Sequence, residues 1–358
     1  MFMHNYENFR YKFPVPQYLG AKHLLLNWLI KFIPKNLNIA LDAFAGSQSV
    51  AYLFKQLGLK TITNDFLKFN HQIGLALIEN QNETLTDEDL EILFSPNGNK
   101  QEFSLMQDVF TDVFFTQEQA EFLDQIRSHV HFLAHPYKQA LALAVINRSL
   151  SRKITMGHFG HTQALNYANN HERVRRNPSL AKPIKDIFLE LLPSYNQAVF
   201  NNQQENKSYA ENILALLPQL LTTEKIDLVY FDPPYCDSHA NYQSFYHLTE
   251  TYTEYWRDKQ FINQTKRYEP QRVSGFDKKQ NIMASFEQLF EYAQEIPYWL
   301  ISYNNRSYPN IEELTQLIAK YRQVKIETKT YTNSRGGKGS VGGSQEILFV
   351  CQPKLRKN

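Results

Sequence analysis

The chain contains the stretch Ile226-Asp227-Leu228-Val229-Tyr230-Phe231-Asp232-Pro233-Pro234-Tyr235, on which its expected fold and chemistry depend. The first six residues form an apolar run typical of a strand. The two prolines end it, because proline fixes its own φ and has no backbone N–H to donate. The strand therefore presents a carboxylate, a rigid main-chain carbonyl and an aromatic ring within four residues.

These three groups suit one reaction, the methylation of an amino group on a heteroaromatic ring. Such an amine is a weak nucleophile because its lone pair is drawn into the ring. The Asp232 carboxylate and the Pro233 carbonyl can each accept one amine hydrogen, which aims the lone pair at an electrophilic methyl group. Tyr235 offers a flat face on which a base can stack. The alternative is an ordinary strand-ending turn, in which Asp, Pro and Tyr are common.

A strand, a tight loop and a helix are predicted nearer the N-terminus. Leu37–Leu41 is the apolar strand, Asp42–Ser49 the loop, and Val50–Leu57 the start of the helix. Gly46 lets a ligand approach the backbone closely, and the loop amides can face a polar or anionic group. A buried strand that leads into a capped helix would give the same pattern.

The next short strand, Lys60–Asn64, is followed by an acidic residue, Asp65. It lies about twenty residues after the first strand, the distance at which an acidic side chain binds ribose hydroxyls in nucleotide-binding βαβ units. Asp65 is therefore a candidate cofactor-ribose ligand. Alternatively, Asn64 or Asp65 caps the helix expected over Phe66–Glu79.

Upstream, the segment Pro16–Lys22 precedes a helical pattern over Leu24–Phe32. Gly20 lies between an aromatic ring and a lysine and would let the chain fold over a bound cofactor. Tyr18 would pack on that cofactor and Lys22 would supply positive charge. A simple loop leading into an amphipathic helix is the alternative.

Together these motifs resemble the signature series of the Dam-like (alpha-group) DNA adenine methyltransferases. The motifs that carry the resemblance are Tyr18-Leu19-Gly20-Ala21-Lys22, Asp42-Ala43-Phe44-Ala45-Gly46-Ser47, Asn64-Asp65 and Asp232-Pro233-Pro234-Tyr235. The resemblance covers residues 14–70 and 225–351 and implies an α/β fold with a Rossmann-like methyltransferase sheet. It also implies transfer of a methyl group from S-adenosyl-L-methionine to the exocyclic amino nitrogen of a flipped adenine in double-stranded DNA.

The resemblance also assigns roles to residues by position. The implied cofactor-binding residues are Tyr18, Lys22, Asp42, Phe44, Gly46, Asp65 and Asp232, and the implied catalytic residues are Asp232, Pro233 and Tyr235. The chain departs from the family at Gln48, where a second glycine is usual. The contacts of this loop are therefore left open.

An aromatic segment, Asn241–Glu250, follows the catalytic turn. A flipped base loses its stacking in the duplex, at a cost of a few kcal/mol, and aromatic surfaces offset that loss. Tyr242 and Phe245 are therefore expected in the base pocket opposite Tyr235, although a core-facing helix start would look the same. His247 is not required as a general base, because the amine can attack first and lose its proton afterwards.

The remaining sheet elements lie near the C-terminus. Tyr298–Asn304 is predicted as a buried strand, and Asn304 at its polar exit is expected to border the base pocket. Val324–Tyr331 and Glu346–Cys351 flank the glycine-rich loop Ser334–Ser344 and predict a terminal antiparallel hairpin. The sheet is thus expected to be mostly parallel, with this hairpin as its antiparallel part.

Residues 91–214 follow none of the sheet pattern and are predicted to form an inserted, mainly helical target-recognition domain. Residues 1–90 and 215–358 would form the catalytic domain. Basic residues gather in the insertion, where they would anchor DNA phosphates beside groups that read base edges. The expected DNA-binding residues are Arg148, Arg152, Lys153, Arg173, Arg175 and Arg176. A solvated charged surface is the alternative.

Composition sets limits on these expectations. A net charge of +2 over 358 residues requires a local basic patch to hold DNA. Two cysteines, Cys236 and Cys351, can form neither a disulfide framework nor a four-cysteine zinc site, and no metal is expected. The polar start, Met1–Arg10, and the short apolar stretches predict a cytoplasmic protein without a membrane partner.

Two other functions remain open from the sequence alone. One is a methyltransferase acting on RNA or on a protein glutamine, and the other is a DNA-binding protein with a degenerate methyltransferase fold. Asp232 and the basic insertion favour DNA methylation. The sequence leaves open whether a cognate restriction endonuclease acts separately beside the enzyme.

Overall fold

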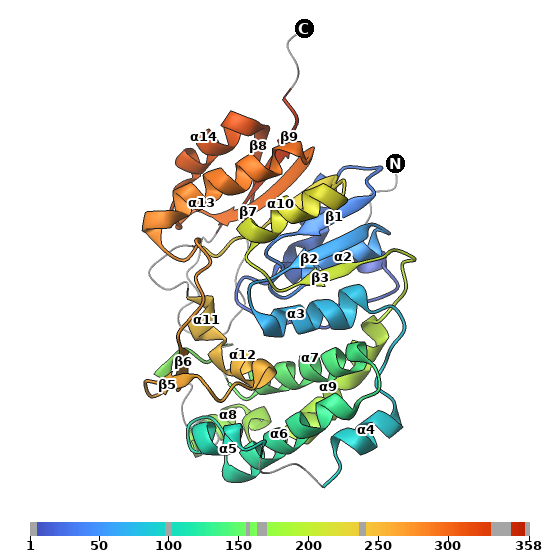
Figure 1. Ribbon diagram of the computed structural model, residues 1–358, viewed down its shortest axis with the longest axis vertical. Coiled ribbons are helices and arrows are strands. Elements are labelled where there is room, and N and C mark those ends of the chain that lie inside the picture. The colour runs from blue at the N-terminus through green and yellow to red at the C-terminus, as the bar shows by residue number, and fades with distance from the viewer. Residues whose placement is uncertain are drawn as a thin grey trace.

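The computed structural model describes residues 6–96, 102–154, 158–162, 170–235, 241–330 and 345–354. Within them, seven strands form one sheet of order β3-β2-β1-β4-β7-β9-β8, and β5 and β6 form a separate hairpin. Figure 1 shows this sheet above a group of helices. The strands are β1 (Ile39–Asp42), β2 (Lys60–Asn64), β3 (Lys207–Tyr209), β4 (Leu228–Phe231), β5 (Gln260–Ile262), β6 (Arg267–Glu269), β7 (Tyr298–Asn304), β8 (Gln323–Thr330) and β9 (Gln345–Gln352).

The sheet is mostly parallel, as the sequence predicts. β1 pairs in parallel with β2 and β4, β2 with β3, and β4 with β7. Only β9 reverses the direction, because it lies antiparallel between β7 and β8. The α/β fold class and the antiparallel terminal hairpin are both confirmed. Parallel strands put their carboxyl ends on one edge of the sheet, so the loops after β1, β2 and β4 meet there.

Helices cover both faces of this sheet, because its strands are apolar on both sides. In β4, Val229 and Phe231 pack in one core with α10, α13 and α14. Leu228 and Tyr230 point the other way, into a second core with α1 and α2. Successive side chains of a strand alternate between its faces, so this one short run supports both layers.

The helices in the described residues are three to 17 residues long. They are η1 (Tyr6–Asn8), η2 (Lys22–Leu25), α1 (Leu26–Leu29), η3 (Ile30–Phe32), α2 (Ser49–Gln56), α3 (Lys68–Gly74), η4 (Leu75–Glu79), α4 (Asp87–Leu93), α5 (Leu105–Phe110), α6 (Gln117–His129), η5 (Val130–Phe132), α7 (Pro136–Arg152), α8 (His171–Arg176), η8 (Pro178–Leu180), α9 (Ile184–Ala198), α10 (Ile213–Thr223), α11 (Tyr242–Phe245), α12 (His247–Glu254), α13 (Lys279–Tyr292), η9 (Ala293–Glu295) and α14 (Ile311–Tyr321).

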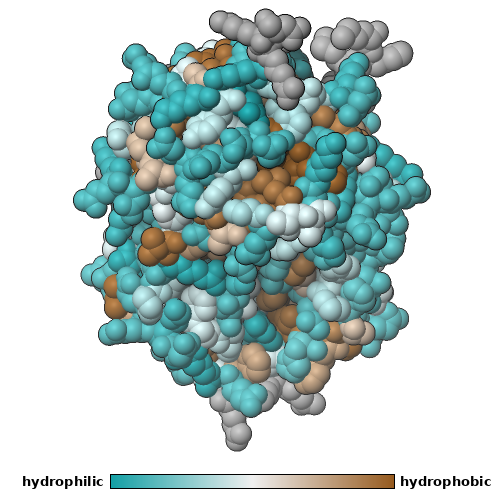
Figure 2. Space-filling view, turned by 45° about the horizontal axis from the view of Figure 1, so that its top comes forward, coloured by the Kyte–Doolittle hydropathy of each residue, from teal (hydrophilic) through white to brown (hydrophobic). Residues whose placement is uncertain are grey.

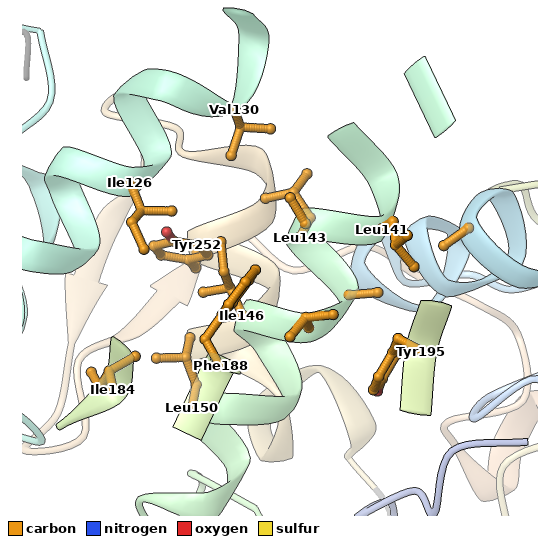
Figure 3. Close-up of a cluster of buried hydrophobic side chains, with 14 of the residues drawn as sticks. Ile126, Val130, Leu141, Leu143, Ile146, Leu150, Ile184, Phe188, Tyr195 and Tyr252 are labelled. Atoms are coloured by element: carbon orange, nitrogen blue, oxygen red, sulfur yellow. The ribbon is translucent and has the colours of Figure 1, made fainter. Parts of the chain in front are cut away.

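A third core fills the helical part of the molecule around α7. Figure 3 shows Ile146 and Leu150 of α7 packed with Ile126 of α6, Phe188 of α9 and Tyr252 of α12. The helix α12 follows the Asp232–Tyr235 turn in the sequence and lies outside residues 91–214. This core therefore also uses residues from outside the predicted insertion. Conversely, β3 lies inside 91–214 but pairs with β2 as an edge strand of the sheet. The boundaries predicted from the sequence therefore differ from those of the packed layers, because β3 belongs to the sheet and α12 to the helical core.

The surface is largely polar on the face that Figure 2 presents. On the face shown in Figure 2, most residues are hydrophilic and hydrophobic ones are exposed in small groups. In the part of the chain that the structure describes, no helix is long and apolar enough to cross a bilayer. The same residues contain no group of three or more His, Cys, Asp or Glu side chains arranged to hold a metal ion. Cys351 is buried and free, and Cys236 lies outside the described residues.

Candidate active site

A pocket of about 800 Å³ opens at the carboxyl edge of the sheet, where β1, β2 and β4 end. Most of the residues predicted for the cofactor and the reaction line it. These are Tyr18, Lys22, Asp42, Phe44, Gly46, Asp65, Asp232, Pro233, Tyr235 and Tyr242. Four motifs that are far apart in the sequence therefore build one cavity.

Lys22 is the charged centre of the pocket. Its ammonium group lies 2.9 Å from Asp232 Oδ2 and 3.3 Å from Glu346 Oε1. It also donates to the carbonyl of Gly20 at 3.0 Å and to the hydroxyl of Tyr235 at 2.9 Å. The lysine is only 4% exposed. A buried ammonium needs such partners because leaving it unpaired would cost several kcal/mol.

The turn Asp232–Tyr235, predicted to be catalytic, places Asp232 between two donors. Lys22 contacts Oδ2, and the hydroxyl of Tyr235 donates to Oδ1 at 2.8 Å. Burial raises the pKa of the Asp232 carboxyl, and Lys22 opposes that rise. Each carboxylate oxygen has two lone pairs, so Oδ1 can accept a further hydrogen from a substrate. The ring of Tyr235 lies edge-on to Tyr303, with centroids 5.4 Å apart.

Asp42 combines a structural contact with an unused acceptor. Its Oδ2 accepts the backbone N–H of Ala51 in the first turn of α2 at 3.0 Å. Its Oδ1 is buried and meets no hydrogen-bond donor in good geometry among the described residues. Burial and the nearby Asp232 raise the pKa of Asp42 well above its ordinary value. A donor or a positive charge in the pocket would stabilise this carboxylate.

Asp65 supports the loop structure as well as lining the pocket. Its Oδ2 accepts the N–H of Gly46 at 2.7 Å, and its Oδ1 accepts from Leu67 N at 2.8 Å and from Asn70 Nδ2 at 3.0 Å. The proposed alternative, a local role at the start of the next helix, therefore also applies. That helix, α3, begins at Lys68 rather than at Phe66. Burial raises the pKa of Asp65.

Gln48 stands where the family that the sequence resembles usually has a second glycine. Gln48 adopts the left-handed region with φ 68°, which glycine reaches without strain. The fully buried side chain of Gln48 accepts from Thr63 Oγ1 at 2.6 Å and donates to the carbonyl of Asn70 at 3.1 Å. These contacts hold the backbone in a conformation that costs a non-glycine residue about 1–3 kcal/mol. The neighbouring Gly46 has no room for a side chain, because a Cβ would lie 2.9 Å from Tyr18 Cε1.

Tyr18 forms part of an aromatic stack over the loop. Its ring lies on that of Tyr246, with centroids 4.6 Å apart and an angle of 11° between planes. Tyr242 lies 5.9 Å from Tyr18. The hydroxyl of Tyr246 also accepts the N–H of Leu19 at 2.6 Å, so α12 is tied to the N-terminal motif. Tyr18 and Tyr242 thus reach the pocket as predicted, and Tyr246 supports them from beneath.

Two residues predicted for the base pocket do not line it. Phe245 faces a separate groove and packs against His158, with ring centroids 4.5 Å apart. The segment around His158 holds it there, because the backbone N–H of Phe159 donates to the carbonyl of Phe245 at 2.7 Å. Asn304 accepts hydrogen bonds from Arg306 N and Ser307 Oγ, both at 2.8 Å. Its amide therefore stabilises the turn after β7 instead of meeting a base.

The groove that contains Phe245 adjoins the pocket. Gln243 and Asp277 line both cavities. Its basic wall consists of Arg267, Arg272 and Lys278. Gln243 and the backbone of Arg272 exchange two hydrogen bonds, at 2.7 and 2.8 Å, which fix the loop after β6 against α11. The groove is therefore a built feature beside the pocket.

The predicted DNA-binding residues divide into two sets. Lys153 is 4% exposed and donates to the carbonyls of Leu180 and Lys182, so the expectation that it contacts DNA is wrong. Arg148 holds the N-terminal segment by donating to Val15 O and Gln17 Oε1. The second set lies on α8. Arg175 and Arg176 are exposed and Arg173 is half-buried.

Arg152 is partly exposed, and its guanidinium forms an ion pair at the surface, 2.6 Å from Glu190 Oε1 of α9. Three of the six predicted residues thus connect parts of the protein. Arg148 holds the N-terminal segment on α7, and Arg152 and Lys153 join the end of α7 to residues between 180 and 190. A run of basic residues does not reveal which of them the packing will use.

Sequence reasoning missed two carboxylates that organise the site. Glu346 contacts Lys22 from β9, and no motif pointed to it. Glu250 of α12 accepts the N–H groups of Lys68 and Phe69 at 3.1 and 3.0 Å and so caps α3 from another helix. Burial raises the pKa of Glu250 to about 7. Each had one signal in the sequence. Glu346 is an acidic residue in an otherwise apolar strand, and Glu250 follows a run of aromatic residues.

Comparisons with known proteins agree with this geometry. The family model described as D12 class N6 adenine-specific DNA methyltransferase matches residues 18–299. The chain is similar to the type II methyltransferase M2.HphI of Haemophilus parahaemolyticus, with 33% identity over 348 residues, which are 95% of this chain and 98% of that protein.

The chain is also similar to the modification methylases LlaI of Lactococcus lactis subsp. lactis and StsI of Streptococcus sanguinis, each with 24% identity. These alignments cover 96% and 94% of this chain but only 56% and 52% of the two methylases. The chain therefore spans about half the length of each of these two relatives.

Proposed function

The chain belongs to the D12 class N6 adenine-specific DNA methyltransferase family, and from this premise we propose how its residues divide the reaction. The resemblance inferred from the sequence is confirmed, and the protein is a site-specific DNA methyltransferase that modifies adenine. We propose that S-adenosyl-L-methionine donates the methyl group and that the target base is flipped into the pocket at Asp232.

The charges in the pocket support this methyl donor. Among the described residues that line it, the charged side chains are one lysine and four carboxyl groups, those of Asp42, Asp65, Asp232 and Asp277. Such a surplus of acidic groups favours a cationic ligand. S-adenosyl-L-methionine is a sulfonium cation, and it supplies an electrophilic methyl group when bound. The buried Oδ1 of Asp42, which meets no well-aligned donor among the described residues, fits a ligand that fills the cavity.

We assign the activation of the amine to the catalytic turn. Asp232 and the carbonyl of Pro233 would each accept one hydrogen of the adenine amine and aim its lone pair at the methyl carbon. The turn is stiffened by two prolines, so the two acceptors lose little free energy in reorganising. Transfer is a single displacement, in which the nitrogen–carbon bond forms as the sulfur–carbon bond breaks. The amine proton leaves afterwards to water. The observation that carries this assignment is that Asp232 lies in one pocket with Asp42 and Asp65.

A path for the duplex follows from the groove beside the pocket. We propose that the DNA backbone next to the target base follows the wall formed by Arg267, Arg272 and Lys278. The adenine would enter the adjoining pocket past Tyr242 and Gln243. Base flipping is required because, within the duplex, the adenine amine cannot reach the methyl donor or the acceptors of the Asp232–Tyr235 turn. We also propose residues 91–214 as the recognition domain and residues 1–90 and 215–358 as the catalytic domain, with β3 as the part of the first range that pairs with the catalytic sheet.

The biological setting is part of the same proposal. The relatives are called type II methyltransferase and modification methylase, so we propose that this enzyme protects DNA from a separate cognate restriction endonuclease. It would act in the cytoplasm, where genomic DNA is accessible.

The test is a methyl-transfer assay with labelled S-adenosyl-L-methionine and mixed-sequence duplex DNA, followed by digestion to nucleosides. We expect the label on N6-methyl-2'-deoxyadenosine released from DNA, with matched RNA as the control substrate. Label on cytosine, on RNA alone or on no nucleoside would contradict the proposal.

A further inference from the structure

Glu346 is a buried carboxylate directly behind the catalytic turn. It lies in β9 and is 1% exposed. Its Oε1 is 3.3 Å from the ammonium of Lys22 and 3.3 Å from the hydroxyl of Tyr235. Both of these groups contact Asp232, at 2.9 and 2.8 Å. Glu346 does not line the pocket and lies beyond the residues that the family model matches.

The surrounding groups make its charge unusual. Lys22 of η2 is shared by Glu346 and Asp232, so two carboxylates face one ammonium. The hydroxyl of Tyr230 and Asp42 also lie near this cluster from β4 and β1, and Ser302 of β7 donates to Glu346. Removing a single carboxylate would leave Lys22 and the other carboxylate as a neutral pair.

Methyl transfer makes this charge balance important. Positive charge moves from the donor sulfur to the adenine nitrogen as the new bond forms. An acceptor beside that nitrogen is most effective when it keeps its negative charge, and a neutralising lysine at 2.9 Å weakens it. A second carboxylate on the same lysine restores the negative potential.

We propose that Glu346 is a positioning residue for methyl transfer, which holds Lys22 and offsets its charge so that Asp232 remains an effective acceptor for the amine. This inference rests on the proposed role of Asp232. Glu346 acts through Lys22 and Tyr235 and touches neither the donor nor the base.

The pH dependence of the rate separates this role from a purely structural one. Burial raises the pKa of both Asp232 and Glu346, and the negative charge of Asp232 also raises the pKa of Glu346. Because this repulsion between the two carboxylates is mutual, a charged Glu346 opposes the ionisation of Asp232. In Glu346→Gln, Asp232 no longer has a like charge nearby and has Lys22 to itself. The pKa of Asp232 then falls. The acidic limb of the rate profile therefore moves to lower pH while the plateau rate decreases.

The experiment is single-turnover methylation of duplex DNA by the full chain across pH 5–9. For Glu346→Gln we expect a plateau rate lower by about ten- to a hundredfold, an acidic limb shifted to lower pH, and a DNA Kd within twofold of wild type. Glu346→Asp keeps the charge and should be faster than Glu346→Gln, although it is shorter.

Three results would overturn the inference. These are an unchanged rate in Glu346→Gln, a reduced rate with an unmoved acidic limb, or a Glu346→Asp enzyme as slow as the amide variant. A Glu346→Asp enzyme slower than wild type but faster than Glu346→Gln supports it. Inactivity of the wild-type protein would instead contradict the proposed function, so the two failures are distinguishable.

Discussion

The pocket at the sheet edge and the basic stretch of the helical region were both predicted from charged residues, but the structure treats them differently. Lys22 and Lys153 are each 4% exposed. Lys22 meets Asp232 and Glu346 at a cavity wall, whereas Lys153 binds two carbonyls inside the helical layer. Burial lowers the pKa of Lys153 to about 8. Residues at the ends of parallel strands share one edge, but a run of charges on helices fixes no common direction.

The largest effect is expected at the pocket, in Asp232→Ala. Loss of the carboxylate removes one of the two acceptors for the amine and leaves Lys22 beside the reacting nitrogen. The single-turnover rate should fall by about a thousandfold or more, while DNA binding is largely retained. Single-turnover assays and a DNA titration measure the two quantities.

Asp277→Ala, assayed at saturating methyl donor, is the control for this variant, because it removes another carboxylate from the lining of the same pocket and leaves the Lys22–Asp232 pair in place. Its rate should stay within tenfold of wild type. Retained methylation in Asp232→Ala would remove the carboxylate from the mechanism.

The second prediction concerns the basic residues that remain at the surface. Replacing Arg173, Arg175 and Arg176 by alanine should weaken DNA binding about ten- to a hundredfold and lower the slope of log Kd against log salt by about one for each lost phosphate contact. Lys278→Ala in the groove should lower the slope by about one.

Arg152→Ala is the control here, because Arg152 bridges α7 to Glu190 of α9 at 2.6 Å, whereas the ion pair of Arg176 with Glu172 lies within α8 itself. It should leave the slope unchanged. An unaltered slope in the triple variant would exclude α8 from the interface, and an unaltered slope in Lys278→Ala would exclude the groove.

A smaller effect should follow from the acidic character of the pocket. Burial raises the pKa of Asp42, Asp65 and Asp232, and a bound cation favours their ionised forms. The preference for S-adenosyl-L-methionine over its neutral product S-adenosyl-L-homocysteine should therefore increase as pH rises. We expect about a tenfold increase between pH 5.5 and 8. Calorimetric titrations of both ligands would test it, and a constant ratio would argue against carboxylate recognition of the sulfonium.

The smallest effect concerns the loop where the chain departs from its family. Gln48→Gly removes left-handed strain but also removes two buried hydrogen bonds. The free energy of unfolding should fall by about 1–2 kcal/mol. Asn36→Gly is the control, because Asn36 has φ 60° but is exposed, and its change should be under about 0.5 kcal/mol. Greater stability of Gln48→Gly in urea denaturation would show that strain dominates.

Much of the fold could be predicted because its signals are local. The apolar runs at β1, β4 and β7 are strands on both of whose faces helices pack, so nearly every residue is hydrophobic. β3 could not be found in this way, since the three residues Lys-Ser-Tyr form a short edge strand without an apolar pattern. Its place in the sheet depends only on pairing with β2.

The site shows the same limit. The residues after β1, β2 and β4 were predicted from local motifs and the family resemblance, and they share one pocket because parallel strands end at the same edge of the sheet. Glu346 could not be found, because its strand is antiparallel and reaches Lys22 only through the order β4-β7-β9. Phe245 was misplaced because the orientation of one helical turn depends on packing against His158, which is distant in sequence.

The most direct test of the central claim is a crystal structure of the enzyme with its duplex and a non-reactive analogue of the methyl donor. The account predicts a flipped adenine whose amino nitrogen lies within about 3.2 Å of both an Asp232 carboxylate oxygen and the Pro233 carbonyl oxygen. An adenine amine bound away from these two oxygens would contradict it.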